Sequence, residues 1–150
     1  MDTPKCINRF LEPQRTAYAI ALEEVQSGRK TGHWMWYVFP QLRGLGQSTS
    51  AWYYGIENLD EARIYLAHPL LGRRLREITQ AILDLPETDI MKFFTWPDNM
   101  KFRSCMTLFA QISEDDLFVQ TLDKFFDGRE NDLTLNLLRQ KEKTYNQYSG

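Results

Sequence analysis

Long apolar runs are missing from this sequence of 150 residues, and so is a leader-like N-terminus. No apolar stretch approaches the roughly 20 residues that a helix needs to span a bilayer. The first ten residues lack the basic segment and apolar run of a signal peptide. We therefore expect a cytoplasmic protein with no membrane partner.

An excess of charge of either sign is also missing. The chain has 18 basic and 20 acidic residues, which gives a net charge of -2, and its pI is near 5.7. Proteins that bind a nucleic-acid backbone usually concentrate a basic excess on one face. We expect no nucleic acid as a partner.

Cysteine and histidine are scarce, with two of each. Cys6 and Cys105 do not form a CxxC motif, and His33 and His68 do not form HExxH or HxH, so nothing demands a metal or another cofactor. We expect two reduced thiols, with Cys105 in the core. GxSxG, the P-loop and the dinucleotide fingerprint are absent as well.

What is present indicates one helical domain. The length suits a single domain over residues 1–150, with its core at about 7–138 and a polar tail at 143–150 that we expect to fray. Apolar residues at helical spacing predict a first helix over 7–26 and a strongly amphipathic helix over 69–85. Further helices are predicted over 48–54, 58–67, 88–94, 98–112 and 113–128, and from about 131.

Helix starts are marked by capping residues. Candidate N-caps are Ser48, Thr49 or Ser50 for the 48–54 helix, Asn58 or Asp60 for the next, and Thr88 or Asp89 for the 88–94 helix. Asn131 or Asp132 begins the last helix. A capping box over 113–116, with Asp in place of the usual Glu, precedes the helix to 128. The buried face of the 98–112 helix should include Phe102, Met106 and Phe109. The fold class is mainly α, with about seven helices and little or no sheet.

The segment from Thr31 to Glu57 stands out, because it holds three of the four tryptophans, one of the two histidines and four of the eight glycines. Residues 33–39 could form a short buried strand or a buried helical turn, and Pro40 ends either one. The mixture of rings, glycines and polar groups predicts a site here. His33 and Glu57 are the candidate catalytic residues, as proton carriers, although His33 could instead pack on the neighbouring aromatic rings.

A glycine loop leads into the next helix start. Gln41, Arg43, Gly44, Gly46 and Ser48 could bind a phosphate or carboxylate through backbone amides, the helix start and the guanidinium. A tight loop with an ordinary cap explains the same residues.

Rings and cations elsewhere could complete a pocket. Trp34, Trp36 and Tyr53 are candidate stacking walls. Lys101, Arg103 and Ser104, near the start of a helix, could hold an anion or could be plain surface groups.

Three motifs together resemble a known family. They read HWMWYVFPQLRGLGQS, YLAHPLLGRRLRE and KFRSCMTLF, and they resemble uncharacterised bacterial and fungal domains that are sometimes mislabelled calpastatin. The resemblance covers about residues 7–138 and implies a single, mostly helical domain with no assigned activity. A looser similarity to the NADAR group, which acts on ADP-ribose and related nucleotides, implies a nucleotide-like ligand but assigns no residues.

These observations favour a small-molecule pocket for a phosphorylated or nucleotide-like ligand, which could support N-glycosidic or ADP-ribosyl hydrolysis. One alternative is a non-catalytic interaction module, whose aromatic groove receives a peptide or helix from a partner. In a third interpretation, Thr31 to Glu57 simply supplies aromatic core. Whether the protein is an enzyme, and its oligomeric state, stay open at this point.

Overall fold

Helices make up nearly all of the fold. The computed structural model describes residues 5–149, and the side chains of residues 7–144 within them. Over this range the chain forms eight α-helices and one 3-10 helix. The same residues contain no β-strand, only a parallel bridge between Leu42 and Ile56. The prediction of a mainly α domain is confirmed. The elements are α1 (Lys5–Ser27), α2 (Met35–Val38), α3 (Thr49–Tyr53), α4 (Leu59–Ala67), α5 (Leu71–Leu83), η1 (Ile90–Lys92), α6 (Asp98–Ala110), α7 (Leu117–Phe126) and α8 (Asp132–Ser149).

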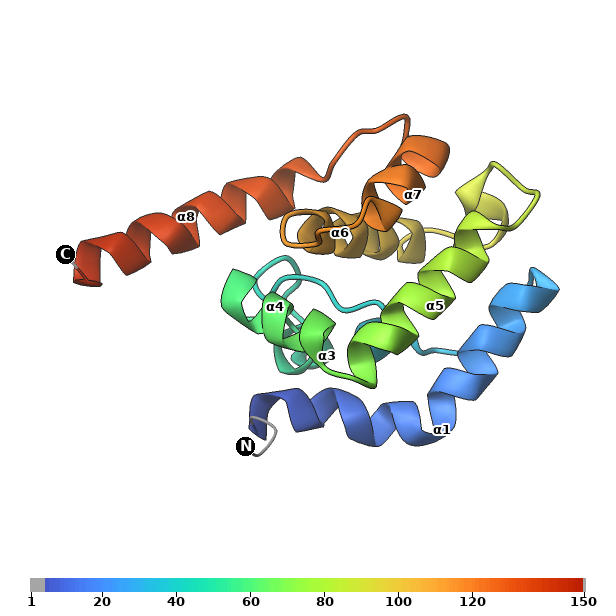
Figure 1. The fold of residues 1–150 in the computed structure, drawn as a ribbon, viewed down its shortest axis with the longest axis horizontal. Helices are drawn as coiled ribbons and strands as arrows, with labels where there is room; N and C mark the ends of the chain where they lie inside the picture. Colours follow the sequence, from blue (N-terminus) through green and yellow to red (C-terminus); the bar gives the residue numbers. More distant parts are fainter. Residues whose placement is uncertain (1–4, 150) are drawn as a thin grey trace.

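The first helix bends around the other elements. α1 includes Pro13 in its interior, and a proline there removes one hydrogen bond and kinks the helix. Figure 1 shows the resulting bend. Before the bend, Arg9 binds Glu61 of α4, and after it the Tyr18 hydroxyl donates to Glu77 of α5. α1 is therefore joined to both α4 and α5 through side-chain hydrogen bonds.

At four helix starts, one of the candidate residues forms the cap. The side chains of Ser48, Asn58 and Asp89 each accept a backbone N–H from the first turn that follows. Asn131 caps α8 in the same way by accepting the amide of Thr134 at 2.9 Å. The side chain of an N-cap residue satisfies a backbone donor that the helix itself leaves free.

The predicted capping box before α7 is wrong. The cap residue Asp116 forms no capping hydrogen bond through its side chain. Asp115 instead accepts the amide of Leu117 at 3.1 Å, and Asp116 accepts the side-chain amide of Gln120 at 2.8 Å. Two adjacent aspartates compete for the same helix start, and the sequence pattern cannot decide between them.

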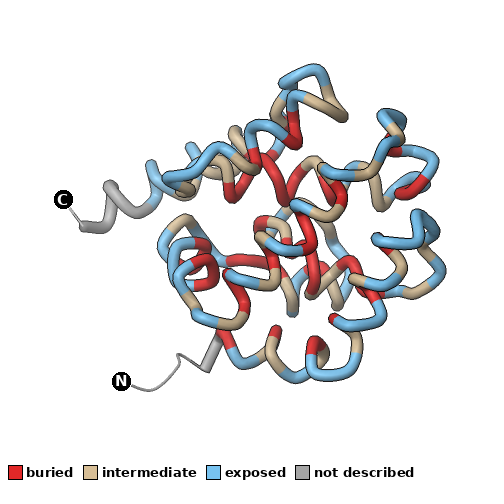
Figure 2. The backbone as a smooth tube through the Cα atoms, turned by 45° about the vertical axis from the view of Figure 1, so that its right-hand side comes forward, coloured by how far each residue is buried: buried red, intermediate tan, exposed pale blue. Residues whose placement is uncertain are grey.

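The core is centred on α6. Phe102, Cys105, Met106 and Phe109 are fully buried, which confirms the predicted face of this helix and the buried thiol of Cys105. Figure 2 shows the buried positions gathered at the centre of the molecule. The expectation for Cys6 lies outside the described side chains.

The last helix leaves the body of the molecule. α8 begins beside α6 and then extends past the other helices (Figure 1). Thr134 is fully buried, whereas residues 135–144 are all partly or fully exposed. α8 continues to Ser149, through the polar tail that we expect to fray from about residue 143. After Thr134, the side chains of α8 are therefore at least partly open to solvent.

Candidate functional site

The aromatic segment folds as two short helices joined by a loop. Residues 35–38 form α2, so the buried helical turn is the alternative that exists. The Arg43 amide donates to the Ile56 carbonyl at 2.7 Å, and the Ile56 amide donates to the Gln41 carbonyl at 2.9 Å. These two hydrogen bonds join the residues at the start of the glycine loop to Ile56, which follows α3. They use the backbone carbonyl of Gln41 and the backbone amide of Arg43.

Trp34 is a core residue, which corrects its expected role as a stacking wall. Its side chain is 2% exposed, and its indole N–H donates to Glu24 at 3.0 Å. The ring meets Phe94 edge-on, with centroids 6.0 Å apart. No ligand can stack on a ring that the protein already covers on its faces and edges.

Glu24 holds the start of the aromatic segment to α1. It accepts the amides of Thr31 and Gly32 at 2.8 and 2.9 Å, in addition to the Trp34 indole. Burial alone would raise the pKa of Glu24, but the hydrogen bonds from Gly32, Trp34 and Thr31 outweigh burial and lower the pKa to about 2. These hydrogen bonds give the Glu24 carboxylate a structural role.

The loop glycines permit close packing. Gly44 has a φ of +111°, which side chains rarely adopt, and a Cβ there would lie 2.9 Å from the side chain of Leu137 in α8. A Cβ on Gly55 would lie 2.6 Å from the Cα of Arg43. Packing against α8 and against the loop itself therefore accounts for these two glycines.

Gly46 and Ser48 also have structural partners. A Cβ on Gly46 would approach the Cβ of Ala51 to 2.8 Å. The Ser48 hydroxyl accepts the Ala51 amide at 3.1 Å, and the helix that it caps has only five residues. The arrangement is the tight loop with an ordinary cap, which was the alternative to a phosphate cradle.

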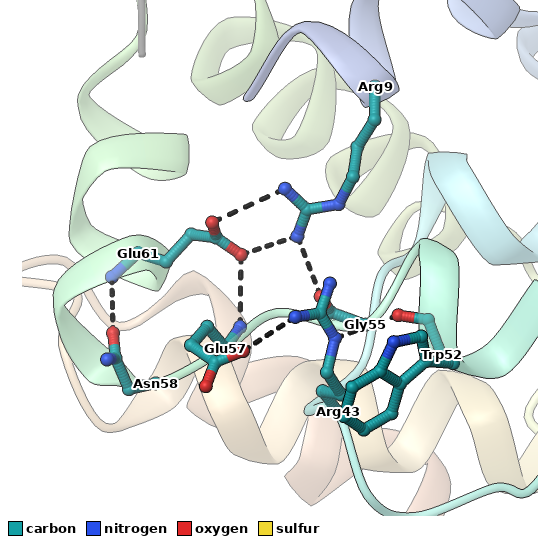
Figure 3. Close-up of polar contacts among 7 residues, drawn as sticks. All are labelled: Arg9, Arg43, Trp52, Gly55, Glu57, Asn58 and Glu61. Atoms are coloured by element: carbon teal, nitrogen blue, oxygen red, sulfur yellow. Dashed lines mark hydrogen bonds and ion pairs between the residues drawn. The ribbon is translucent and has the colours of Figure 1, made fainter. Parts of the chain in front are cut away.

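Arg43 joins Glu57 and Trp52 in an exposed cluster (Figure 3). One guanidinium nitrogen lies 2.6 Å from the Glu57 carboxylate, and Nε donates to the Trp52 carbonyl at 2.8 Å. The guanidinium lies 4.8 Å from the centre of the Trp52 ring. Trp52 and Tyr53 are 63% and 52% exposed, so this cluster offers rings and charge to solvent.

A buried ion pair lies next to that cluster. The Arg9 and Glu61 side chains are 8% and 9% exposed, and their charged groups meet at 2.5 Å. Arg9 also donates to the Gly55 carbonyl at 2.7 Å, and Glu61 accepts the Glu57 amide at 3.0 Å (Figure 3). The pair therefore holds the backbone at Gly55 and at Glu57, just before α4 begins.

Trp36 and Lys101 belong to a second cluster. Lys101 lies 4.0 Å above the centre of the Trp36 ring and 3.5 Å from Asp98, whose other oxygen lies 2.9 Å from Lys30. His33 is exposed nearby in sequence. The ammonium group of Lys101 already has a ring and a carboxylate as neighbours.

The two predicted catalytic residues are held by different parts of α1. His33 belongs to the turn that Glu24 holds, whereas Glu57 belongs to the network around Arg9. The bend at Pro13 lies between Arg9 and Glu24. A proton donor and acceptor must reach one reacting bond, and among the described residues no hydrogen bond or ion pair joins His33 to Glu57.

Arg103 and Ser104 belong to neither cluster. Arg103 donates to the carbonyls of Arg129 and Glu130 at 2.8 and 3.0 Å, and so holds the connection between α7 and α8. Ser104 is 5% exposed. Arg103, which we expected to hold an anionic ligand, instead binds carbonyl groups of the protein's own backbone.

A groove of about 980 Å³ lies between the start of α4 and α8. Of the predicted site residues, only Glu57 lines it. Sequence reasoning missed the rest, because the leucines of the last helix were expected in the core and residues 139–142 suggested no site. The apolar lining is Leu59, Leu135, Leu137 and Leu138, and the charged lining is Glu57, Asp60, Arg63, Arg139, Lys141 and Glu142.

Large apolar side chains are exposed on three helices, of which α4 and α8 line the groove. Leu133 of α8 is 68% exposed, Trp52 of α3 is 63% exposed and Ile64 of α4 is 41% exposed, and none of the three lines the groove itself. Contiguous exposed apolar surface marks interaction sites and ligand grooves, whereas single exposed apolar residues are ordinary. The sequence alone had placed such residues only on core-facing positions.

The described part of the chain offers neither a metal-ligand cluster nor a membrane-spanning helix. Within it, no group of three or more His, Cys, Asp or Glu side chains is arranged to hold a metal ion. None of the helices in that part is long and apolar enough to cross a bilayer. The cytoplasmic location stays a prediction.

Comparison with known proteins places the chain in a family. The family model described as protein of unknown function (DUF1810) matches residues 4–138. The chain belongs to this family. The conserved hypothetical protein Rv1873 from Mycobacterium tuberculosis, known from a crystal structure, is 46% identical to this DUF1810 chain. The similarity covers 89% of this chain and 96% of that one, with a TM-score of 0.86. No curated protein matches the chain.

The comparisons support part of the expected resemblance. The DUF1810 description agrees with a family of helical domains whose activity is unassigned. The looser similarity to the NADAR group and the calpastatin label stay predictions, because neither comparison includes them. The family match ends at residue 138, part-way along α8.

Proposed function

We propose that this domain is a non-catalytic interaction module that receives a peptide segment of a partner protein in the α4–α8 groove. The observation that carries the proposal is the groove itself, with a leucine floor and charged side chains at its edges. A bound segment would bury apolar side chains on the leucines and keep its polar groups at the charged edge.

The character of the site favours a segment over a reacting metabolite. The groove is open and is bounded on one side by a helix that extends past the body. Among the described residues no hydrogen bond or ion pair joins His33 to Glu57, the residues expected to move protons, and Trp34 is buried. Binding through apolar contact needs none of these groups, whereas hydrolysis would need an acid and a base at one place.

A second candidate is a nucleotide-like ligand at the Arg43 cluster. The exposed Trp52 ring beside the Arg43 guanidinium offers one surface for a base and one charge for a phosphate. Glu57 would be the carboxylate for an N-glycosidic or ADP-ribosyl hydrolysis. In a thermal-shift screen with ADP-ribose, a ligand at about 100 times its Kd adds about 2.7 kcal/mol of stability. A shift that Arg43→Ala abolishes would favour this candidate.

The proposed function is tested by selecting binders from a library of random displayed peptides. Leu135→Gln changes the groove floor, whereas Leu133→Gln makes the same change on the same helix at a residue that does not line the groove. We expect the selected peptides to lose binding to the first variant and to keep binding to the second, with both variants equally helical. Peptides that bind all three proteins alike, or a selection without binders, would refute the proposal.

A further inference from the structure

We infer that the partner segment is acidic as well as apolar, and that the basic residues of α8 select it. This inference rests on the proposed interaction function and adds the chemistry of the partner. It depends on which charges of the groove are already neutralised within the protein and which are left for a partner.

The acidic residues on the α4 side of the groove have cationic neighbours of their own. The Glu57 carboxylate lies 2.6 Å from Arg43, and the Asp60 carboxylate lies 3.0 Å from Arg63. Each pair is neutral as a unit. The α4 side therefore has little net charge to offer a bound segment.

The basic residues on the α8 side lack such neighbours. Neither Arg139 nor Lys141 forms an ion pair with any residue whose side chain the structure describes, and Arg139 donates only to the neutral amide of Asn136, at 2.8 Å. Glu142 is the one acidic residue on this side. With Arg43–Glu57 and Asp60–Arg63 neutral, two cations and one anion are left, so the groove is positive towards a partner.

The apolar floor and the basic residues are adjacent along α8. Leu138 and Lys141 are three residues apart, which is about 4.5 Å along the helix. A partner that covers both must carry acidic side chains within about one helical turn of its apolar ones. Such a pattern describes an acidic amphipathic segment.

The family match ends at residue 138, so the leucine floor falls within it while Arg139 and Lys141 follow it.

The test repeats the peptide selection with a charge-reversed groove. The variant Arg139→Glu/Lys141→Glu inverts the basic residues, and Arg15→Glu/Arg29→Glu makes the same charge change in α1 and just after its end, at exposed residues that do not line the groove. We expect wild-type protein to enrich peptides with Asp or Glu beside apolar residues. By fluorescence anisotropy, these peptides should bind the groove variant about five- to tenfold more weakly and the α1 variant unchanged.

The outcomes separate the inference from the function beneath it. Enriched peptides that depend on Leu135 but show no acidic preference, or that lose affinity equally in both reversed variants, would overturn the inference and leave the interaction function standing. A selection with no Leu135-dependent peptide would overturn both. Displacement of the selected peptides by a single-stranded oligonucleotide at equal concentration would replace a protein partner with nucleic acid, and would overturn both as well.

Discussion

Removing Arg9 should destabilise the fold more than any loss of surface charge. Arg9→Met keeps most of the aliphatic volume but takes away the donors that Glu61 and the Gly55 carbonyl now receive. The carboxylate would then stay in a site where its side chain is only 9% exposed. Breaking a buried ion pair from one side costs about 3–5 kcal/mol, a large part of the roughly 5–15 kcal/mol that stabilises a domain.

A double-mutant cycle separates this pair from its surroundings. Arg9→Met, Glu61→Met and the double variant would be unfolded in urea and followed by circular dichroism. Because the second substitution removes the carboxylate whose guanidinium partner the first removes, the double variant should cost less than the sum of the singles, by about 1–3 kcal/mol. Arg63→Met is the control, since its ion pair with Asp60 is exposed and worth at most about 1 kcal/mol. Additive single effects, or an Arg9→Met cost no larger than the control, would refute the buried pair as described.

Three further predictions use the same unfolding assay. Gly72→Ala should lower the free energy of unfolding by more than about 3 kcal/mol, because its Cβ would meet the Leu66 carbonyl oxygen at 1.9 Å. Gly28→Ala, with open space around it, should lower it by about 1 kcal/mol. Similar losses in the two variants would contradict the close α4–α5 crossing. Trp34→Ala should cost about 3–5 kcal/mol as a core truncation, and a fully stable variant would show that the ring is not core. Because the folded pKa of Glu24 is lowered from 4.5 to about 2, its contribution is complete above pH 4.5 and is lost as the pH falls towards 2; Glu24→Gln should flatten this part of the pH profile, and an unchanged slope would exclude the carboxylate as its source.

Local patterns in the sequence predicted most of the helices. The apolar spacing of the 69–85 region and the capping side chains of Ser48, Asn58 and Asn131 have their effects within one or two helical turns, so the sequence alone specifies them. The pattern was insufficient at α7, where Asp115 and Asp116 could each cap the helix. The length of α8 was missed for a related reason, because a polar sequence can be a frayed end or an exposed helix.

The site was harder to predict, because its residues acquire their roles through distant partners. The sequence around Trp34 is typical of a ligand-stacking site, but Glu24 and Phe94 contact the ring and help to bury it. Gly44 looked like part of an anion cradle until Leu137, which is 93 positions further along the chain, was found against it. Rings and glycines have the same sequence signature in a pocket and in a tightly packed core.

The most direct test of the interaction groove is a map of backbone amide shifts by nuclear magnetic resonance as a selected peptide is added. We predict that the changes concentrate at Asn58, Leu59 and residues 135–144, where the groove lies. Changes centred instead on His33, Trp36 and Lys101, with the groove amides unmoved, would contradict the account.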